Sequence, residues 1–434
     1  MSDRVAVIGG GMAGLCAAYF MREKHDVTLF ERQARAGGNA FTLNLPDGLH
    51  ADIAVAAFGR SGYKNFYQLL DQLGVRTRRS GSGFLSVEDL DSGEGVYLSP
   101  TPRGLWAQNF DLLRPSRVRM LWQLSRSLAK ARRIQAASGF EGLSMREGLR
   151  LLPNVAAGSD AETILLCALC LMSSMSGDEV LDAPAEFFFG KLAVHSDVIS
   201  PRAFWSVRTV HGGTQAYIAA LQRALGERVV LNAKIRSVAR HDDGVVLTFE
   251  DGTRQGFDRV VFACNADRTL ALLEDPTELE LELLSPWRYK DGRLVVHRDH
   301  AYFPPDELMQ AFTFLYRREG GGLETSVNGV MRFLADMPDD CDLIGSQHPN
   351  FPIRPELIVF DTVFRTPIFD SAAFAVQPRL PELNGERNCY HCGSHFGFGL
   401  HEDAVTSAMA AASSIDQAAR VEHSGGVERF LRAS

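Results

Sequence analysis

The sequence lacks several features that would assign it quickly to a class of protein. Its longest uninterrupted apolar run, residues 164–172, is much shorter than the roughly 20 residues that a membrane-spanning helix needs. It contains neither a Walker phosphate loop nor the G-x-S-x-G elbow of hydrolases, so NTPase and hydrolase functions have no support. The formal net charge of −8 argues against nucleic acid as a partner, because proteins that bind it carry an excess of positive charge.

Cysteine is also scarce, with seven residues scattered along the chain. Two C-x-x-C pairs, Cys167/Cys170 and Cys389/Cys392, have a spacing seen in zinc sites. The first pair lies in an apolar helical pattern and the second in a strand, where positions i and i+3 face opposite sides, so we predict no metal site. Because the first strand is expected from residue 4, no cleavable signal peptide fits before it, and we expect a cytoplasmic protein with reduced thiols.

The first forty residues carry the strongest functional signal. Residues 4–8 have the β-branched composition of a buried strand, residues 15–24 form a helical pattern, and residues 27–31 predict a second strand. The glycine-rich segment 9–14 between the first strand and the helix fits G-x-G-x-x-G. Strand, glycines, helix and strand in this order predict a dinucleotide-binding βαβ unit.

Each position of this fingerprint has a physical role. Gly9 permits the tight turn, Gly11 lets the backbone approach a pyrophosphate, and Gly14 lets the helix pack closely on the strand. The pyrophosphate would bind at the positive end of the helix dipole, and Glu31 is placed to accept a hydrogen bond from a ribose hydroxyl. The further glycine pair at residues 37–38 favours FAD over NAD, because a longer cofactor needs a second close approach of the backbone.

The next segment contains a turn and a stretch of small residues. Asp47-Gly48 predicts a hairpin that joins residues 41–45 to the following extended segment. Residues 51–59 are rich in small side chains, which suits either a backbone lying against a flat ring system or a buried connecting strand. The sequence leaves these two alternatives open.

The remainder of the chain alternates between a helical region and returning strands. Between about residues 62 and 201 there are few strand signals, which predicts an inserted substrate domain; its patterns are helices over 63–73, 112–133, 161–174 and 178–189, and two short strands within 84–98. Strand patterns return in residues 229–238, 258–264 and 388–393, before a last helix over 401–419. The nucleotide-binding domain is therefore predicted to be assembled from separate pieces.

The helical region over 112–133 is basic, with no acid between Arg114 and Arg133. Leu121, Leu124 and Leu128 form an apolar stripe along it. Such a helix can rest on an anionic membrane surface or attract an acidic substrate. Alternatively, it is a solvated face whose acidic partners lie elsewhere in the fold.

These segments together resemble the flavin-containing amine oxidase superfamily, which includes monoamine and polyamine oxidases, protoporphyrinogen oxidase and phytoene desaturases. The resemblance rests on the N-terminal fingerprint, the glycine pair 37–38, the segment 205–213 (WSVRTVHGG) and the segment 392–403 (CGSHFGFGLHED). It is strongest to a bacterial branch of predicted NAD/FAD-binding proteins, some of them associated with modified fatty-acid synthesis.

The resemblance implies an α/β fold with a Rossmann-like FAD-binding domain of the glutathione-reductase/amine-oxidase type and an inserted α+β substrate domain. The FAD-binding domain would comprise residues 1–61, 205–265 and 385–434, and the substrate domain residues 62–204 and 266–384. The implied cofactor is FAD, held noncovalently. Its predicted binding residues are Gly9, Gly11, Gly14, Glu31, Gly38, Asn39, Ile235, Gly393, Glu402, Asp403 and Val405.

Two residues are candidates for catalysis. His395 belongs to a sequence cluster with His391 and His401 near the proposed flavin edge, where a histidine can act as a base or orient substrate. A structural or cofactor-supporting role is the alternative for all three. Lys290 lies in the region where polyamine oxidases have an active-site lysine.

The implied reaction moves hydride from a substrate C–H bond to flavin N5 and forms a C=C or C=N bond. The substrate would be a small molecule, either an amine or a lipid, with lipid slightly favoured by the basic helix and by the relatives. Oxygen or another electron acceptor would reoxidise the flavin. Two alternatives remain: a flavin-dependent double-bond isomerase, and a non-enzymatic prenyl- or lipid-binding protein of the dissociation-inhibitor type. Peripheral contact with the inner membrane face through residues 114–133 is a further expectation.

Overall fold

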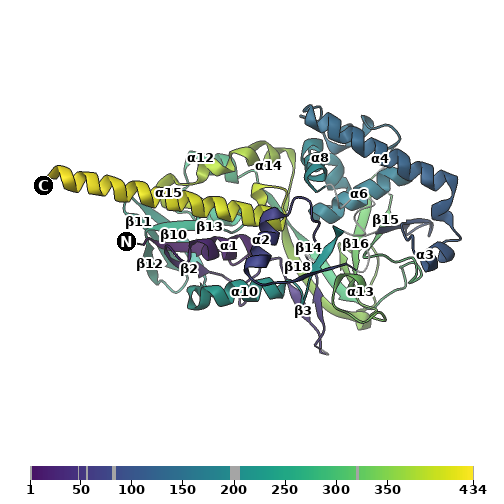
Figure 1. Ribbon diagram of the computed structural model, residues 1–434, viewed down its shortest axis with the longest axis horizontal. Coiled ribbons are helices and arrows are strands. Elements are labelled where there is room, and N and C mark those ends of the chain that lie inside the picture. Colours follow the sequence, from purple (N-terminus) through teal and green to yellow (C-terminus); the bar gives the residue numbers. More distant parts are fainter. Residues whose placement is uncertain are drawn as a thin grey trace.

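The computed structural model describes residues 2–46, 48–54, 57–80, 85–195, 206–318 and 322–433, the segment 421–433 by its backbone alone. The molecule is elongated, with helix α15 (His401–Ala433) extending from one end and helix α4 (Pro115–Ala136) lying at the other (Figure 1). Several residues named above lie outside the described ranges: Asp47, residues 55–56, Phe84 and Trp205.

A five-stranded parallel sheet forms the end towards which both termini lie (Figure 1). Its order is β19 (Cys389–His391), β13 (Arg259–Phe262), β1 (Arg4–Ile8), β2 (Asp26–Phe30) and β9 (Val229–Val230), and every pairing is parallel. Helix α1 (Met12–Met21) follows β1 and packs against α15 and α10 (Gln215–Leu225). The predicted α/β fold with a Rossmann-like parallel sheet is confirmed.

All five strands come from the three ranges assigned to the FAD-binding domain. The central strand was predictable because its run from Val5 to Ile8 is apolar and fully or almost fully buried, as expected for a strand covered on both faces of the sheet. The domain boundaries themselves stay a prediction.

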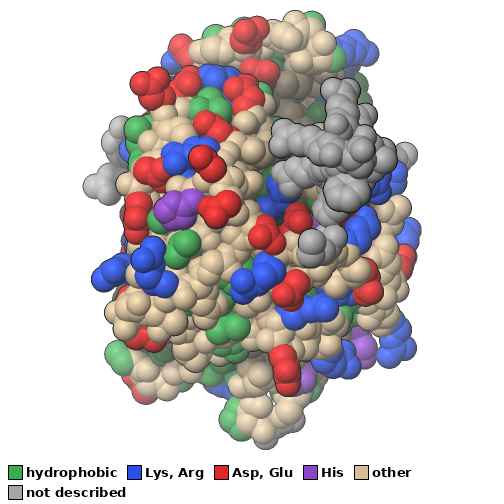
Figure 2. Space-filling view, turned by 90° about the vertical axis from the view of Figure 1, so that its left-hand side faces the viewer, with side chains coloured by type: hydrophobic (Ala, Val, Ile, Leu, Met, Phe, Trp, Pro, Cys, Tyr) green, Lys and Arg blue, Asp and Glu red, His purple; other side chains and the backbone are tan. Residues whose placement is uncertain are grey.

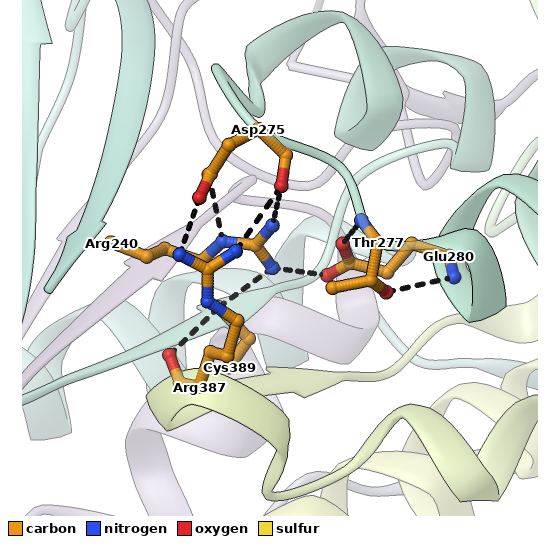
Figure 3. Close-up of polar contacts among 6 residues, drawn as sticks. All are labelled: Arg240, Asp275, Thr277, Glu280, Arg387 and Cys389. Atoms are coloured by element: carbon orange, nitrogen blue, oxygen red, sulfur yellow. Dashed lines mark hydrogen bonds and ion pairs between the residues drawn. The ribbon is translucent and has the colours of Figure 1, made fainter. Parts of the chain in front are cut away.

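A small antiparallel sheet, β10 (Ile235–His241), β11 (Gly244–Phe249) and β12 (Arg254–Phe257), is joined to the parallel sheet by an ion-pair cluster in which Arg240 and Glu280 are buried (Figure 3). Arg240 of β10 pairs with Glu280 of α12 (Glu278–Leu284) at 2.5 Å and with Asp275 at 3.1 Å. Arg387, just before β19, contacts the other carboxylate oxygen of Asp275 at 2.5 Å. Thr277 caps α12 by accepting the Glu280 N–H at 3.2 Å. Three segments distant in sequence are thus fixed to one another.

A seven-stranded mixed sheet forms the other half of the described molecule. Its order is β18 (Ile358–Ile368), β14 (Arg288–His297), β17 (Ile344–Gln347), β16 (Glu324–Val330), β15 (Phe312–Arg317), β6 (Leu85–Asp89) and β7 (Gly95–Tyr97). Only the β15–β6 pairing is parallel among these, and the other five pairings are antiparallel. The two strands predicted within 84–98 are β6 and β7.

Helices cover one side of this sheet and form the largest apolar core (Figure 1). They are α4, α5 (Met145–Arg150), α6 (Asp160–Ser173), α7 (Gly177–Asp182) and α8 (Ala185–Val194). Helix α3 (Pro102–Ala107) lies at the same end of the molecule but contributes no residue to this core (Figure 1). The single helix predicted over 178–189 is wrong, because Pro184 separates α7 from α8. The residue before a proline is disfavoured in helical conformation, and Ala183 is extended, with ψ of 163°.

The remaining elements connect these layers. The predicted hairpin is β3 (Thr42–Asn44) with β4 (His50–Asp52), and β5 (Thr77–Arg79) pairs with β8 (Arg208–Val210). The other α-helices are α2 (Lys64–Gln72), α11 (Ala266–Leu272), α13 (Met331–Leu334) and α14 (Ser371–Val376). Short 3-10 turns are η1 (Asp111–Leu113), η2 (Gly226–Arg228), η3 (Pro355–Leu357), η4 (Gln377–Leu383), η5 (Glu386–Asn388) and η6 (Ser394–Phe396). Among the described helices, none has the length and apolar character needed to cross a membrane.

Candidate cofactor and substrate site

The loop between β1 and α1 requires glycine at two positions. Gly9 has φ of +111°, and a Cβ there would lie 2.7 Å from the carbonyl oxygen of Ala263. A Cβ on Gly14 would lie 1.9 Å from the carbonyl oxygen of Gly9, so helix and loop could not pack as they do. Gly11 differs, because a Cβ there would meet nothing within 4 Å. Gly11 lines a cavity, so its open side is where a ligand can approach the N-terminus of α1.

Glu31 follows the last residue of β2 and lines the same cavity. One of its carboxylate oxygens accepts the backbone N–H of Gly10 at 2.7 Å, and the other accepts that of Gln33 at 2.7 Å. A carboxylate oxygen can accept more than one hydrogen bond. Glu31 is therefore fixed by the backbone and keeps the capacity to accept from a ribose hydroxyl.

The second glycine pair packs directly on the first loop. The N–H of Gly37 donates to the carbonyl oxygen of Gly10 at 2.7 Å, and Gly38, with φ of +58°, would place a Cβ 3.1 Å from Cα of Gly11. Asn39 donates from Nδ2 to the carbonyl oxygen of Arg365 at 3.1 Å. Gly38 and Asn39 both line the cavity beside Gly11. The two glycine motifs thus form one cradle.

Ile235 and Gly393 bring two further segments to the cavity wall. Ile235 is the first residue of β10, and Gly393 follows the end of β19. The Gly393 N–H donates to Ser407 Oγ at 3.1 Å, and a Cβ on Gly393 would lie 2.5 Å from the His395 ring. Glycine is therefore needed here to let the imidazole pack against the backbone.

The cavity has a volume of about 1080 Å³ and is lined by residues from the glycine cradle to the seven-stranded sheet. Ordinary ligand pockets measure roughly 300–1,000 Å³, so this one has room for a dinucleotide and a substrate together. Beyond the cradle its wall combines polar residues such as Ser174, Arg293, Gln347 and His348 with the apolar residues Leu171, Met172, Leu294, Phe312, Val327, Met331, Phe360, Phe364, Phe369 and Phe398.

Three residues predicted to bind the cofactor lie behind the cavity wall. Glu402 accepts two backbone N–H groups in the first turn of α2, at 3.0 and 2.8 Å. Asp403 accepts the N–H of Leu400 at 2.8 Å, and Val405 is fully buried in the apolar core. The hydrogen bonds of Glu402 and Asp403 and the burial of Val405 hold the start of α15 in place. Direct contact of these residues with the cofactor stays a prediction.

Lys290 lies on β14, and its ammonium group forms an ion pair with Glu179 of α7. Lys290 is not among the residues that line the cavity. Its catalytic assignment stays a prediction, and this pairing favours a structural role that joins α7 to the sheet.

The three neighbouring histidines take different places. His395 lines the cavity in an edge-on contact with Trp287, with ring centroids 5.2 Å apart, and burial lowers its pKa to about 4. His401 also lines the cavity, its Nε2 lies 2.7 Å from the Tyr217 hydroxyl, and burial lowers its pKa to about 4. His391 stacks on Phe262 away from the cavity lining, and burial lowers its pKa to about 3. All three are therefore neutral near pH 7.

Lys191 was missed from the sequence, although it interrupts the apolar run that follows Glu186 in α8. Its side chain is fully buried, and its ammonium group donates to the carbonyl oxygens of Met172 and, at 2.7 Å, of Phe398. Burial lowers the pKa of Lys191, and the nearby Asp403 carboxylate opposes this effect. Both carbonyl groups belong to cavity-lining residues, so Lys191 joins α6 to the loop before α15 from behind the wall.

His348 and Ser174 were also missed, and no sequence signal marks them. Both line the cavity with positive φ angles, 50° for His348 and 56° for Ser174, which non-glycine residues rarely adopt. The His348 ring lies over Gly292, where a Cβ would approach it to 2.8 Å. The pKa of His348 is lowered by burial and by the Lys290 ammonium group. Strained backbone at a cavity wall is typical of functional sites.

Asp52 contributes a buried carboxylate at the cavity wall, at the end of β4. It accepts hydrogen bonds from the Thr42 hydroxyl at 2.6 Å and from the Thr214 backbone N–H at 2.8 Å. Burial nevertheless raises the pKa of Asp52 to about 6, against the effect of these hydrogen bonds. The resulting contact ties the β3–β4 hairpin to the start of α10.

These residues fit an FAD molecule. The glycine cradle leaves open space only at Gly11, Glu31 is oriented by the backbone, and the cavity continues beyond the cradle to an apolar wall. Among the described residues, no group of three His, Cys, Asp or Glu side chains could hold a metal ion. The fold and site define a flavoprotein with a Rossmann-type cofactor domain and an adjoining substrate chamber.

Residues 12–288 match the family of flavin containing amine oxidoreductases. The match covers more than half of the chain, so the protein belongs to this family, and its cofactor is FAD. A Mycobacterium tuberculosis protein named flavin-containing monoamine oxidase AofH is 26% identical over 297 residues, which is 67% of this chain and 63% of the relative. The chain thus matches less than two thirds of that relative's length.

Solved structures share the fold over nearly the whole chain. A CLA-producing fatty acid isomerase from P. acnes has a TM-score of 0.67 at 18% identity, covering 94% of this chain and 97% of that one. An engineered putrescine oxidase has a TM-score of 0.68 at 15% identity, covering 96% and 99%. At these identities the likeness establishes the architecture alone.

Proposed function

We propose that the protein is an FAD-dependent oxidoreductase that removes hydride from a substrate C–H bond to form C=C or C=N. The observation that carries this proposal is the continuous cavity, which has Gly11 and Glu31 at one end and an apolar wall at the other. When bound, FAD supplies the hydride acceptor, and oxygen or another electron acceptor reoxidises it. The chain's own contribution is to position the substrate and exclude water.

The cavity wall favours a lipid-like substrate over a small amine. Beyond the cradle it is lined by side chains such as Leu171, Phe312 and Val327, which suit an acyl or isoprenoid chain. An amine remains the alternative, because His348 and His395 face the same space with lowered pKa values and can accept a proton or hydrogen bond. The family name and the monoamine oxidase relative support this alternative.

The site residues take distinct roles in this proposal. Gly9, Gly11, Gly38 and Glu31 would hold the pyrophosphate and ribose, whereas Ile235, Asn39 and Gly393 would line other parts of the cofactor. His395, neutral at pH 7, would accept a hydrogen bond from substrate or cofactor rather than carry charge. Lys191 would act indirectly, through the carbonyl groups of Met172 and Phe398.

A flavin-dependent double-bond isomerase is the second candidate. The specific observation is the nearly full-length likeness to the structure of the CLA-producing fatty acid isomerase. Non-enzymatic lipid binding has less support, because the matching family is described as flavin containing. Both enzymatic functions use the same cavity, and they differ in whether the substrate loses two hydrogens.

The test is to mix the FAD-loaded protein without oxygen with unsaturated fatty acids and, separately, with primary amines. An oxidoreductase bleaches the flavin; it gives a fatty acid lighter by two hydrogens or, from a primary amine, an imine that water converts to the aldehyde and ammonia. An isomerase gives a product of unchanged mass and consumes no acceptor. Leu171→Trp would fill the cavity and abolish turnover of a long chain while FAD remains bound. The matched control, Leu281→Trp, changes an exposed leucine on α12 and would leave turnover unchanged. Colourless protein that cannot be reconstituted with FAD would contradict the proposal.

A further inference from the structure

Helices α3 and α4 lie at the end of the molecule farthest from the free end of α15 (Figure 1), and this region carries several exposed apolar side chains. They lie on α3, on η1 and on the first half of α4, within residues 106–122. Their exposed fractions are 75% for Trp106, 48% for Phe110, 57% for Leu113, 51% for Val118 and 57% for Trp122. No other exposed tryptophan occurs among the described residues. We call these five residues the apolar patch.

The apolar patch is not simply the exposed edge of the core. Leu124 and Ala131 turn the buried face of α4 inward, where the helix packs on α8 and α6. Val118 and Trp122 are four residues apart and therefore lie one above the other on the opposite face. The helix is apolar on both sides, and only one side has a partner in the described chain.

The same outer face of α4 is basic. Between Pro115 and Ala136 there are six Lys or Arg residues and no Asp or Glu. Arg117 is neutralised by Asp111 at 2.7 Å and by Asp160. Within the described ranges, four exposed arginines have no carboxylate at ion-pair distance: Arg119, Arg126, Arg132 and Arg133. The guanidinium group of Arg126 stacks on the Trp122 ring, 4.7 Å from the ring centre.

This arrangement contrasts with the rest of the molecule. The formal net charge is −8, and the face at the α15 end shows Lys, Arg, Asp and Glu side chains interspersed (Figure 2). Mixed charges are ordinary for a solvated surface. The outer face of α4 instead combines unpaired positive charges with exposed aromatic rings.

We propose that the apolar patch and the arginines of α4 form a docking surface for an anionic lipid bilayer. Tryptophan and phenylalanine rings insert at the boundary between headgroups and acyl chains, and arginines bind the lipid phosphates. Each basic residue near an anionic membrane adds to the attraction, which falls off with ionic strength. A symmetric contact between two copies is disfavoured, because it would bring the same basic surfaces face to face.

Docking in this way would place the substrate end of the molecule at the membrane. Helix α4 packs against α6, and α6 supplies Leu171 and Met172 to the cavity wall. Helices α4 and α6 would thus lie between the bilayer and the cavity. The docking proposal itself does not depend on the reaction and would hold equally for an amine substrate.

The experiment is flotation of the FAD-loaded full chain with vesicles of phosphatidylcholine alone and of equimolar phosphatidylcholine and phosphatidylglycerol. We expect binding to the anionic vesicles only, weakened by salt and accompanied by a change in tryptophan fluorescence. Arg119→Glu/Arg126→Glu should reduce the vesicle association constant at least tenfold, and so should Trp106→Ala/Trp122→Ala.

The matched controls change exposed residues at the other end of the molecule. Arg223→Glu/Arg254→Glu alters the net charge equally, and Leu281→Ala removes an exposed apolar side chain, and neither should change binding. Because all the altered side chains are exposed, flavin content and melting temperature should stay at the wild-type value, which shows that the variants fold.

Three outcomes would overturn the proposal. The first is the absence of wild-type binding to anionic vesicles. The second is equal binding by the wild type and both patch variants. The third is a wild-type dimer that the patch variants convert to monomer without any vesicle binding, which would assign this face to a protein interface.

Discussion

The two ends of the cavity are built in different ways. At the cradle, the key residues from Gly9 to Asn39 lie close together in sequence, and their positions are set by backbone geometry. At the substrate end, the wall is assembled from α6, several strands of the mixed sheet and the loop before α15. Buried polar contacts such as those of Lys191 hold these distant segments together. The comparison teaches that the glycine cradle depends on a local motif, whereas the opposite wall of the cavity depends on long-range packing.

The largest expected effect is on the free energy of unfolding, at the ion pair that joins distant segments of the cofactor end. Arg240→Met removes the cation that neutralises Glu280, whose side chain is 2% exposed. Breaking a buried ion pair in this way costs about 3–5 kcal/mol of unfolding free energy. Chemical denaturation measures the loss, and Arg293→Met, which removes an exposed pair with Asp361, should cost at most about 1 kcal/mol. Equal losses of unfolding free energy in the two variants would show that burial of the Arg240–Glu280 pair does not increase its contribution to stability.

The second prediction separates folding from binding within the cradle. Gly14→Ala introduces a Cβ 1.9 Å from a backbone oxygen, so we expect a destabilisation of about 1–3 kcal/mol together with loss of flavin. Gly11→Ala has open space and should fold normally while its affinity for FAD falls at least tenfold, because the methyl group occupies the approach of the pyrophosphate.

Melting temperature and flavin absorbance measure both effects. Gly256→Ala, at another glycine with nothing near its Cβ but on an exposed strand, is the control and should change neither quantity. Tight FAD binding by Gly11→Ala would contradict the location of the cofactor.

The third prediction tests the substrate end through Lys191→Met. The substitution leaves the carbonyl oxygens of Met172 and Phe398 without their buried donor, which should cost about 1–3 kcal/mol. Because these residues line the cavity, we expect the KM for substrate to rise while the affinity for FAD changes little. Steady-state kinetics and flavin titration measure the two effects. Weakened FAD binding with an unchanged KM would contradict the prediction, because Lys191 would then support the cofactor end of the cavity.

The last prediction concerns the pH dependence of stability at Asp52, where the hairpin meets α10. Burial raises its pKa from 3.8 to about 6, so the folded protein holds a proton there that the unfolded chain has released. Its contribution is therefore complete below about pH 4 and is lost as pH rises through about 6, with a slope of at most about 1.4 kcal/mol per pH unit. In Asp52→Asn this part of the stability curve should be flatter. Parallel curves for the two proteins would remove Asp52 as the cause.

Much of the cofactor half could be predicted from the sequence because each of its signals is short-range. The glycine motif, the apolar strand pattern before and after the helix, and the acid at the end of the second strand all occur within forty residues. The resemblance assigns Glu402 and Asp403 to cofactor binding, but the sequence could not indicate that both hydrogen-bond to backbone behind the cavity wall. The break at Pro184 was a local signal that was overlooked.

The substrate half resisted prediction for a physical reason. Lys191, Ser174 and His348 have no motif, and their importance arises only when distant elements enclose them in a low-dielectric wall. Lys290 looked suitable by position, but the fold pairs it with Glu179. Similarly, the basic sequence of α4 left its role open until the structure showed which of its side chains remain exposed.

The sequence by itself determined the cofactor fingerprint, the α/β class and the family resemblance, because backbone geometry and strand burial are written in neighbouring residues. Only the tertiary structure decided which polar groups face the cavity, which lie behind it, and which apolar surface is left without a partner. Those properties depend on contacts between segments far apart in the chain, and no local pattern encodes them.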